Sequence, residues 1–166
     1  MKNKKEKSDI KMHFVDSNIF INWLKGSKEK IKTDRITQLS GFVLYRIENG
    51  EEAITSNLVK EEVAIWLSRY KRSNLSQFLE NLTGYVSLRI VEAEYDDQIQ
   101  AERILGKVPL GYIDCINLAI MNRLNIKEIY STDKGFDDIE EIERIFEILE
   151  KDSEYTEFLE WYDINL

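Results

Sequence analysis

Short apolar runs alternate along the chain with longer segments of helical periodicity, and this alternation restricts the fold more than any other feature. Between the runs, apolar residues recur at the three- and four-residue spacing of a helix face. Strands separated by helices predict an α/β fold, with a parallel sheet that helices cover on both faces. Four runs have the length and composition of strands: MHFV (12–15), AITS (53–56), YVSLRIV (85–91) and EIYS (128–131).

The segment FDDIEEIERIFEIL (136–149) permits two interpretations. Its apolar residues Ile139, Ile142 and Phe146 fit one face of a helix. The shorter run IERIF (142–146) fits a strand instead. The sheet is therefore predicted to have four to five strands.

A length of 166 residues suits one domain with its own core. Residues 1–11, MKNKKEKSDIK, are rich in lysine and poor in apolar residues, so we expect a flexible arm there. We expect the domain itself to span 12–150. Residues 151–166 predict an amphipathic helix, with Tyr155 and Phe158 on its apolar face, that packs on the domain or extends it.

The chain carries 23 basic and 31 acidic residues, a net charge of −8. No overall positive field attracts nucleic acid or an anionic membrane, so a polyanionic partner needs cations supplied locally. Cys115 is the only cysteine and cannot form an internal disulfide. No run approaches the roughly 20 apolar residues of a membrane span. These features predict a cytoplasmic protein without membrane contact.

Acidic residues follow two of the predicted strands. Asp16 comes directly after MHFV, and Asp133 comes directly after EIYST. In an open parallel sheet, ligands bind in the crevice outside the carboxyl ends of the strands. An Asp after a strand can equally cap the next helix, and Ser17 or Asn18 can also cap the helix that ends at Gly26. Position alone leaves both roles open.

Helical geometry separates Glu61 from Glu62. At about 100° per residue, the stripe of Val59, Val63 and Trp66 leaves Glu61 almost opposite. Glu62 instead lies on the flank of the buried face, in a helix that starts next to the end of AITS. Glu62 is therefore the glutamate that can face the same crevice, although an ordinary boundary glutamate would show the same pattern.

Asp114 opens a helix whose remaining residues to Leu124 are largely apolar. Asn117, three residues later, lies on the same side of that helix. A buried unpaired carboxylate is costly or takes up a proton, but the helix dipole also favours an Asp near a helix start. Asp137 and Asp138 follow the turn KGF, from which one of them can reach the crevice.

Four carboxylates that converge on one crevice repel each other and raise one another's pKa unless a cation lies among them. Oxygen ligands of this kind select Mg²⁺ or Mn²⁺, with waters completing the coordination shell. The single His13 and the single Cys115 do not make a zinc site. A carboxylate-bound divalent ion can activate a water for attack on a phosphodiester bond.

In this order the residues resemble the PIN-domain (PilT N-terminus) family of metal-dependent ribonucleases, which includes the VapC toxins of toxin–antitoxin pairs. The resemblance extends from about Phe14 to about Phe146. Its most specific part is the order "Asp, Leu-Ala, strand, Thr-Asp-x-x-Phe". Three stretches carry it: FVDSNIF (14–20), TSNLVKEEVAIWL (55–67) and LGYIDCINLAIMNRLNIKEIYSTDKGF (110–136).

The resemblance implies a three-layer α/β/α sandwich and favours a strand for IERIF. It also implies an Mg²⁺- or Mn²⁺-dependent endoribonuclease with RNA as substrate. As the toxin of a toxin–antitoxin pair, the chain would bind a small antitoxin and form a homodimer or higher homo-oligomer. The matching positions are Asp16, Glu62, Asp114 and Asp133 as catalytic metal ligands, Asp137 as a further variable ligand, and Asn18, Ser131 and Thr132 as groups that orient them.

Two other functions fit parts of the pattern. A haloacid-dehalogenase phosphatase also uses a strand-end Asp, as nucleophile, but it needs a second Asp two residues later, where this chain has Asn18. A PIN-like scaffold that binds RNA or a protein without catalysis would keep the fold. Four convergent carboxylates favour the nuclease, because a scaffold has little need of them. The lysine-rich arm and the segment after Lys151 depart from a minimal toxin.

Overall fold

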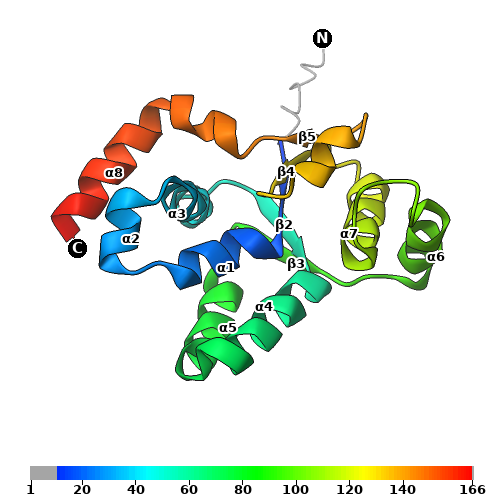
Figure 1. The fold of residues 1–166 in the computed structure, drawn as a ribbon, viewed down its shortest axis with the longest axis horizontal. Helices are drawn as coiled ribbons and strands as arrows, with labels where there is room; N and C mark the ends of the chain where they lie inside the picture. Colours follow the sequence, from blue (N-terminus) through cyan, green and yellow to red (C-terminus); the bar gives the residue numbers. More distant parts are fainter. Residues whose placement is uncertain (1–10, 166) are drawn as a thin grey trace, which may run out of the picture.

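The computed structural model describes residues 11–165, so the predicted lysine-rich arm lies outside the described residues except for Lys11. Five parallel strands form one sheet in the order β3-β2-β1-β4-β5 (Figure 1). From β1 the chain adds β2 and β3 on one side of the sheet and then returns to add β4 and β5 on the other side. The carboxyl ends of β1 and β4 therefore form a topological switch point. The strands are β1 (His13–Val15), β2 (Ala53–Ser56), β3 (Leu88–Val91), β4 (Glu128–Tyr130) and β5 (Glu143–Arg144).

Helices cover both faces of the sheet. Figure 1 shows α6 and α7 on one side and α1, α2 and α3 on the other, which gives three layers. Within the described residues, no helix combines the length and the apolar character needed to cross a membrane. The α-helices are α1 (Ser17–Lys25), α2 (Lys28–Thr33), α3 (Arg35–Glu48), α4 (Asn57–Tyr70), α5 (Leu75–Gly84), α6 (Tyr95–Ile104), α7 (Tyr112–Arg123) and α8 (Ser153–Asn165), and the 3₁₀ segments are η1 (Arg72–Asn74), η2 (Lys134–Asp138) and η3 (Glu147–Lys151).

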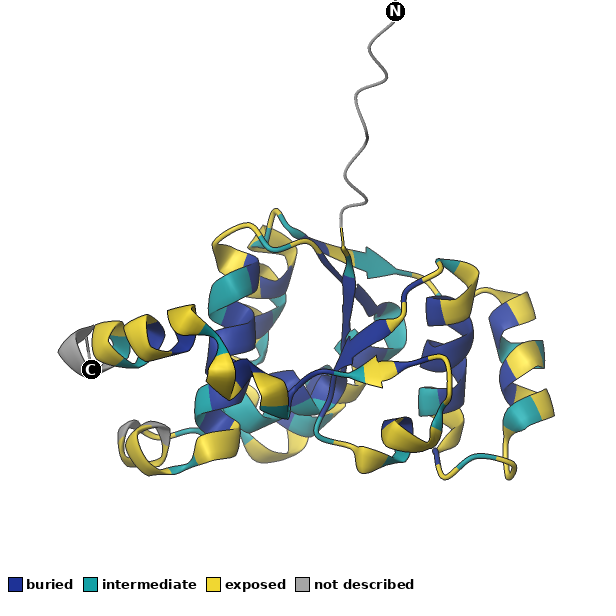
Figure 2. Cartoon of the chain, turned by 90° about the horizontal axis from the view of Figure 1, so that it is seen from above, coloured by how far each residue is buried: buried dark blue, intermediate teal, exposed yellow. Residues whose placement is uncertain are grey.

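The core lies on the strands and on the inner sides of the helices, where Figure 2 shows the buried residues. Phe14 of the central strand pairs in register with Ile54 on one side and Ile129 on the other, and all three are fully buried. Burial on both faces explains why these strands read as continuous apolar runs rather than as an alternation.

Helix α8 packs on α3 through aromatic side chains. Phe158 is 1% exposed, and its ring centroid lies 5.5 Å from that of Phe42 and 5.4 Å from that of Tyr45. Tyr162 lies 5.3 Å from Trp23 of α1 in an edge-on arrangement. The contact joins the end of the chain to the helical layer that begins next to Asp16.

The predicted α/β fold with a parallel sheet and a fifth strand is confirmed. The helix interpretation of residues 136–149 is wrong, because that segment divides among η2, β5 and η3. The third strand is shorter than predicted and starts at Leu88, because a turn comes first, in which the N–H of Leu88 donates to the carbonyl of Tyr85 at 3.4 Å. The cap of α1 is Asp16 rather than Ser17 or Asn18, whereas the helix does end at Gly26 as expected.

Replacing Phe158 with alanine should lower the free energy of unfolding by about 3–5 kcal/mol, because a buried ring is lost and a cavity remains. Urea denaturation followed by circular dichroism measures this change. Glu157→Ala, at an exposed position of the same helix, is the matched control and should change stability by less than about 0.5 kcal/mol. Equal losses in the two variants would contradict the packing of α8 on α3.

Candidate active site

The carboxyl ends of β1 and β4 lie side by side because the two strands are parallel neighbours. Asp16 follows β1, and its N–H donates to the carbonyl of Tyr130 at 3.1 Å. Asp133 follows β4 after a two-residue turn. Helix α4 begins directly at the end of β2, which places Glu62 in its second turn. Three strand ends therefore position the predicted acids along one edge of the sheet.

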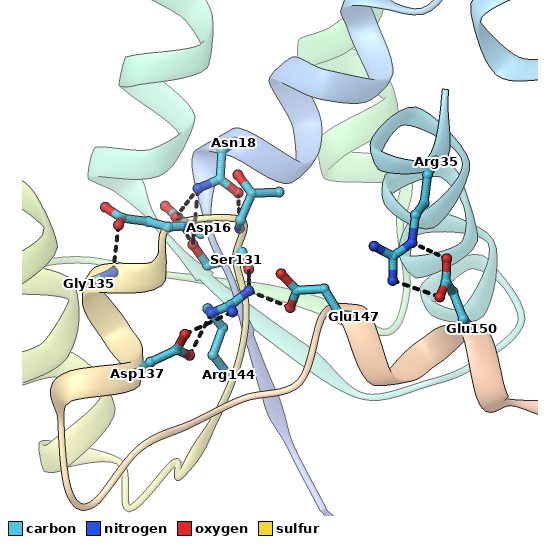
Figure 3. Close-up of polar contacts among 11 residues, drawn as sticks. Asp16, Asn18, Arg35, Ser131, Gly135, Asp137, Arg144, Glu147 and Glu150 are labelled. Atoms are coloured by element: carbon cyan, nitrogen blue, oxygen red, sulfur yellow. Dashed lines mark hydrogen bonds and ion pairs between the residues drawn. The ribbon is translucent and has the colours of Figure 1, made fainter. Parts of the chain in front are cut away.

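Asp16 is only 3% exposed, and both of its carboxylate oxygens accept hydrogen bonds. Oδ1 accepts the N–H of Ser17 at 2.7 Å. Oδ2 accepts the hydroxyl of Ser131 at 2.7 Å and the amide of Asn18 at 2.5 Å (Figure 3). Asp16 thus caps α1 and also points into the region between β1 and β4, so the two roles left open by the sequence are compatible.

Asn18 and Ser131 join the start of α1 to the turn after β4. The amide of Asn18 donates to the hydroxyl of Ser131 at 3.0 Å, and its carbonyl accepts the N–H of Thr132 at 3.0 Å. Ser131 also accepts the N–H of Asp133 at 3.0 Å. Thr132 enters this network through its backbone, whereas Ser131 supplies the hydroxyl that meets Asp16.

The turn that carries Asp133 packs tightly against the loop before α7. Asp133 accepts the N–H of Gly135 at 2.8 Å and caps η2. A Cβ atom at Gly135 would lie 2.6 Å from the carbonyl oxygen of Pro109 and 2.9 Å from a methyl carbon of Leu110. Only glycine permits this approach, which brings Asp133 toward the N-terminus of α7 and Asp114.

A buried hydrogen bond connects the helix of Asp114 with the helix of Glu62. Asn117, in α7, is 1% exposed and accepts the hydroxyl of Ser56 at 2.7 Å. Ser56 in turn accepts the N–H of Val59 at 3.1 Å and caps α4. Ser56 was not among the residues predicted for the site, although a serine between a strand and a helix is a signal for a cap.

The pKa values show that the acids interact. Burial raises the pKa of Asp16 to about 7; the Ser131 hydrogen bond opposes this change, and the charges of Asp114 and Glu62 add to it. Burial also raises the pKa of Asp114 to about 6, with further contributions from Asp133 and Glu62. The structure therefore brings the four predicted acids into one region in which their charges repel.

These acids suit a divalent cation because all of their donor atoms are carboxylate oxygens, and not because they already form a complete ligand set. Among residues 11–165, no three His, Cys, Asp or Glu side chains already surround a common point as metal ligands would. Glu62 and Asp133 are exposed, and Asp114 is half-buried. Mg²⁺ is commonly held by one or two carboxylates with waters in the remaining positions. An all-oxygen, mutually repelling set of this kind suits Mg²⁺ or Mn²⁺, which would relieve the repulsion.

Asp137, which the sequence predicted as a further variable ligand, pairs with Arg144 in this structure. Its two carboxylate oxygens accept hydrogen bonds from Arg144 at 2.8 and 3.0 Å, and this pairing holds the pKa of Asp137 below its usual range. Both oxygens of Asp137 therefore already accept hydrogen bonds from a cation. The signal for Arg144 in the sequence was a charged residue between Ile142 and Ile145, both of which are buried.

The comparisons with known proteins agree with this architecture. A family model described as the PIN domain matches residues 13–142. This chain belongs to the PIN domain family. The resemblance inferred from the sequence is thereby confirmed, and as a family PIN domains are nucleases. Helix α8 lies beyond the matched region. A search of curated proteins gave no match.

Three solved structures are similar in fold to this PIN domain. VapC20 of Mycobacterium tuberculosis, a toxin that cleaves the sarcin–ricin loop, has a TM-score of 0.63 and 18% identity over 80% of this chain and 98% of that chain. A toxin–antitoxin complex from Klebsiella pneumoniae has a TM-score of 0.58 and 15% identity, covering 80% and 96%. VapBC2 of Rickettsia felis, bound to a promoter DNA fragment, has a TM-score of 0.57 and 13% identity, covering 79% and 95%.

Asp16→Asn should stabilise the metal-free PIN domain at pH 7.5 by up to about 4 kcal/mol. Because the pKa of Asp16 is raised to about 7, the folded state keeps a proton that the unfolded state loses near pH 4. Stability therefore falls as the pH rises from about 4 to about 7, and asparagine removes this contribution. The measurement is urea denaturation in chelator at both ends of the window.

Asp138→Asn, at an exposed position, is the control and should follow the wild-type pH dependence. If Asp16→Asn and the wild type lose stability in parallel between pH 4 and 7, Asp16 does not carry the raised pKa.

Proposed function

We propose that this PIN domain is an Mg²⁺- or Mn²⁺-dependent endoribonuclease that hydrolyses RNA phosphodiester bonds. The main support is the buried carboxylate of Asp16, whose pKa is raised beside Asp114 and Glu62 at the topological switch point. Such a carboxylate lowers the stability of the metal-free fold at neutral pH. Strongly perturbed acids in a crevice are candidates for catalysis, and here their donor chemistry fits a divalent cation.

In this proposal the four acids have two roles. Asp16, Asp114 and Asp133 would hold the metal, and Glu62 would ligate it or orient the attacking water. The bound ion would supply a water activated for attack and would compensate the charge that develops on the leaving oxygen. Asp137 is left out of the ligand set because Arg144 occupies both of its oxygens.

The surrounding polar residues hold these acids in place. Ser131 and Asn18 donate to the same oxygen of Asp16 and so fix the plane of its carboxylate. The hydrogen bond between Ser56 and Asn117 fixes the helices that carry Glu62 and Asp114 relative to each other. Groups that orient ligands in this way commonly change metal affinity by about 10- to 100-fold when they are removed.

We further propose that the chain is the toxin of a toxin–antitoxin pair and acts in the cytoplasm as a homodimer or higher homo-oligomer. The support is the family and the toxin–antitoxin systems among its structural neighbours. The antitoxin would be a small protein that covers the acidic crevice.

Expression of this chain in a bacterial host should arrest growth, and the Asp16→Asn substitution should relieve the arrest.

RNA cleavage by the purified protein tests the enzymatic proposal through two adjacent glutamates. With Mn²⁺ and a mixed RNA pool, Glu62→Gln should lower the cleavage rate by at least about 100-fold, because a group that orients the attacking water is lost. Glu61→Gln, the matched control on the exposed side of the same helix, should leave the rate within about twofold. Asp16→Asn should abolish cleavage, as should a chelator.

Cleavage that persists in chelator, or in the Asp16→Asn variant, would falsify the metal mechanism. A non-catalytic PIN-like scaffold is the second candidate, because the fold alone is compatible with binding without chemistry. Calorimetry separates the two functions: a protein that binds no Mn²⁺ near neutral pH and cuts no RNA is the scaffold.

A further inference from the structure

Arg144 is a buried cation beside the acidic region, and its contacts reach three segments of the chain. Its side chain is 6% exposed although it belongs to the edge strand β5. Two of its nitrogens donate to Asp137 in η2, and a third donates to Glu147 at 2.5 Å and to the backbone carbonyl of Ser131 at 3.2 Å. Figure 3 shows the guanidinium between the carboxylates of Asp137 and Glu147.

The contact with Ser131 connects Arg144 to the acids. Ser131 donates its hydroxyl to Asp16 and accepts the N–H of Asp133 on the same oxygen. Arg144 holds the carbonyl of this residue, so the backbone and the side chain of Ser131 are fixed from opposite directions. A displacement of that backbone would change the positions of two proposed metal ligands together.

Other residues keep Arg144 itself in place. Its two-point pair with Asp137 fixes the plane of the guanidinium, and this pair raises the pKa of Arg144, so the group stays charged. Glu147 belongs to η3, and Glu150 at the other end of η3 pairs with Arg35 of α3. Arg144 is therefore held by Asp137 and Glu147, whereas the pair of Glu150 with Arg35 is a separate ion pair between η3 and α3.

We propose that Arg144 is a positioning residue for the metal-binding acids: it holds the turn from Ser131 to Asp133, and Asp137 serves as its anchor. The part of this inference that concerns metal rests on the proposed function. A contribution to stability alone would not require an arginine, because a buried ion pair is commonly no more stabilising than apolar residues of the same volume. The planar guanidinium explains why this position carries an arginine, because it pairs with the carboxylate of Asp137 and donates to the carbonyl of Ser131 at the same time.

The test compares Arg144→Gln and Arg144→Lys with Arg35→Gln in the full chain. Arg35→Gln is the matched control, because it breaks the ion pair with Glu150 in the same segment without touching Ser131. Two quantities are measured: Mn²⁺ affinity by calorimetry, and hydrogen exchange at the backbone amides of Thr132 and Asp133.

Both Arg144 variants should weaken Mn²⁺ binding by about 10-fold or more and should speed exchange at Thr132 and Asp133. Arg35→Gln should change neither quantity by more than about twofold. Lysine keeps the charge but loses the fork, so an Arg144→Lys variant with wild-type Mn²⁺ affinity and wild-type exchange would overturn the positioning role in favour of a purely electrostatic one. Equal behaviour of Arg144→Gln and Arg35→Gln would overturn it too.

A double-mutant comparison tests the role of Asp137. If Asp137 acts through Arg144, Asp137→Asn should add no further loss of Mn²⁺ affinity in the Arg144→Gln background. An additive loss would make Asp137 a ligand in its own right and would overturn its role as an anchor.

Failure of the proposed function is recognised separately. If the wild type itself binds no Mn²⁺, the nuclease proposal fails, and the exchange of the Thr132 and Asp133 amides alone decides whether Arg144 holds the turn. An Arg144 variant that fails to fold is replaced in the test by Asp137→Asn in the wild-type background. This variant keeps the arginine but removes the carboxylate that anchors it, so exchange at Thr132 and Asp133 must become faster.

Discussion

The carboxylate of Asp16 is buried at the end of the central strand, close to other acids, and no salt bridge to it is found within residues 11–165. Hydrogen bonds from Ser17, Asn18 and Ser131 lower the cost of this burial but do not cancel it, since the pKa still rises to about 7. The folded chain thus carries an electrostatic cost at neutral pH that a bound divalent ion would remove. The position of this carboxylate follows from the sheet, because β1 pairs with β4 in parallel and both strands end at the same edge.

The rest of the fold holds the four acids near one another although their charges repel. Buried aromatic rings join α8 to α3, and the hydrogen bond between Ser56 and Asn117 joins α4 to α7. Arg144 links η2, β5 and η3. The acids therefore occupy fixed positions, and a divalent ion held by them would take much of its coordination sphere from water, as Mg²⁺ commonly does.

Much of this architecture was predictable from the sequence because it depends on local periodicity. Continuous apolar runs located the strands, and the order of the acids after those runs located the crevice. The two-residue strand β5 was harder to predict, because a helical spacing of isoleucines overlapped with it and only pairing with β4 decides the outcome. Asp16 could not be assigned to capping or to the crevice, since its side chain does both.

The residues that the sequence did not reveal act through contacts between distant segments. Ser56 meets Asn117, which is 61 positions away, and Arg144 meets the carbonyl of Ser131, which is 13 positions away. No periodicity encodes such pairs, because each depends on how helices and strands pack in three dimensions. Asp137 illustrates the same limit: its place in the sequence predicted a variable ligand, but its pairing with Arg144 of β5 could not be predicted because it depends on the fold.

The most direct test of a cation-dependent acidic crevice is the thermal unfolding midpoint of the full chain with and without Mn²⁺, at pH 7.5 and at pH 5. A ligand that binds only the folded state raises this midpoint, and the rise grows with the logarithm of the ligand concentration divided by its Kd. At pH 7.5, where Asp16 and Asp114 are largely ionised, Mn²⁺ should raise the midpoint clearly; at pH 5, where both are mostly protonated, the rise should be much smaller. No rise at either pH, or the same rise at both, would contradict a metal site built on these two acids.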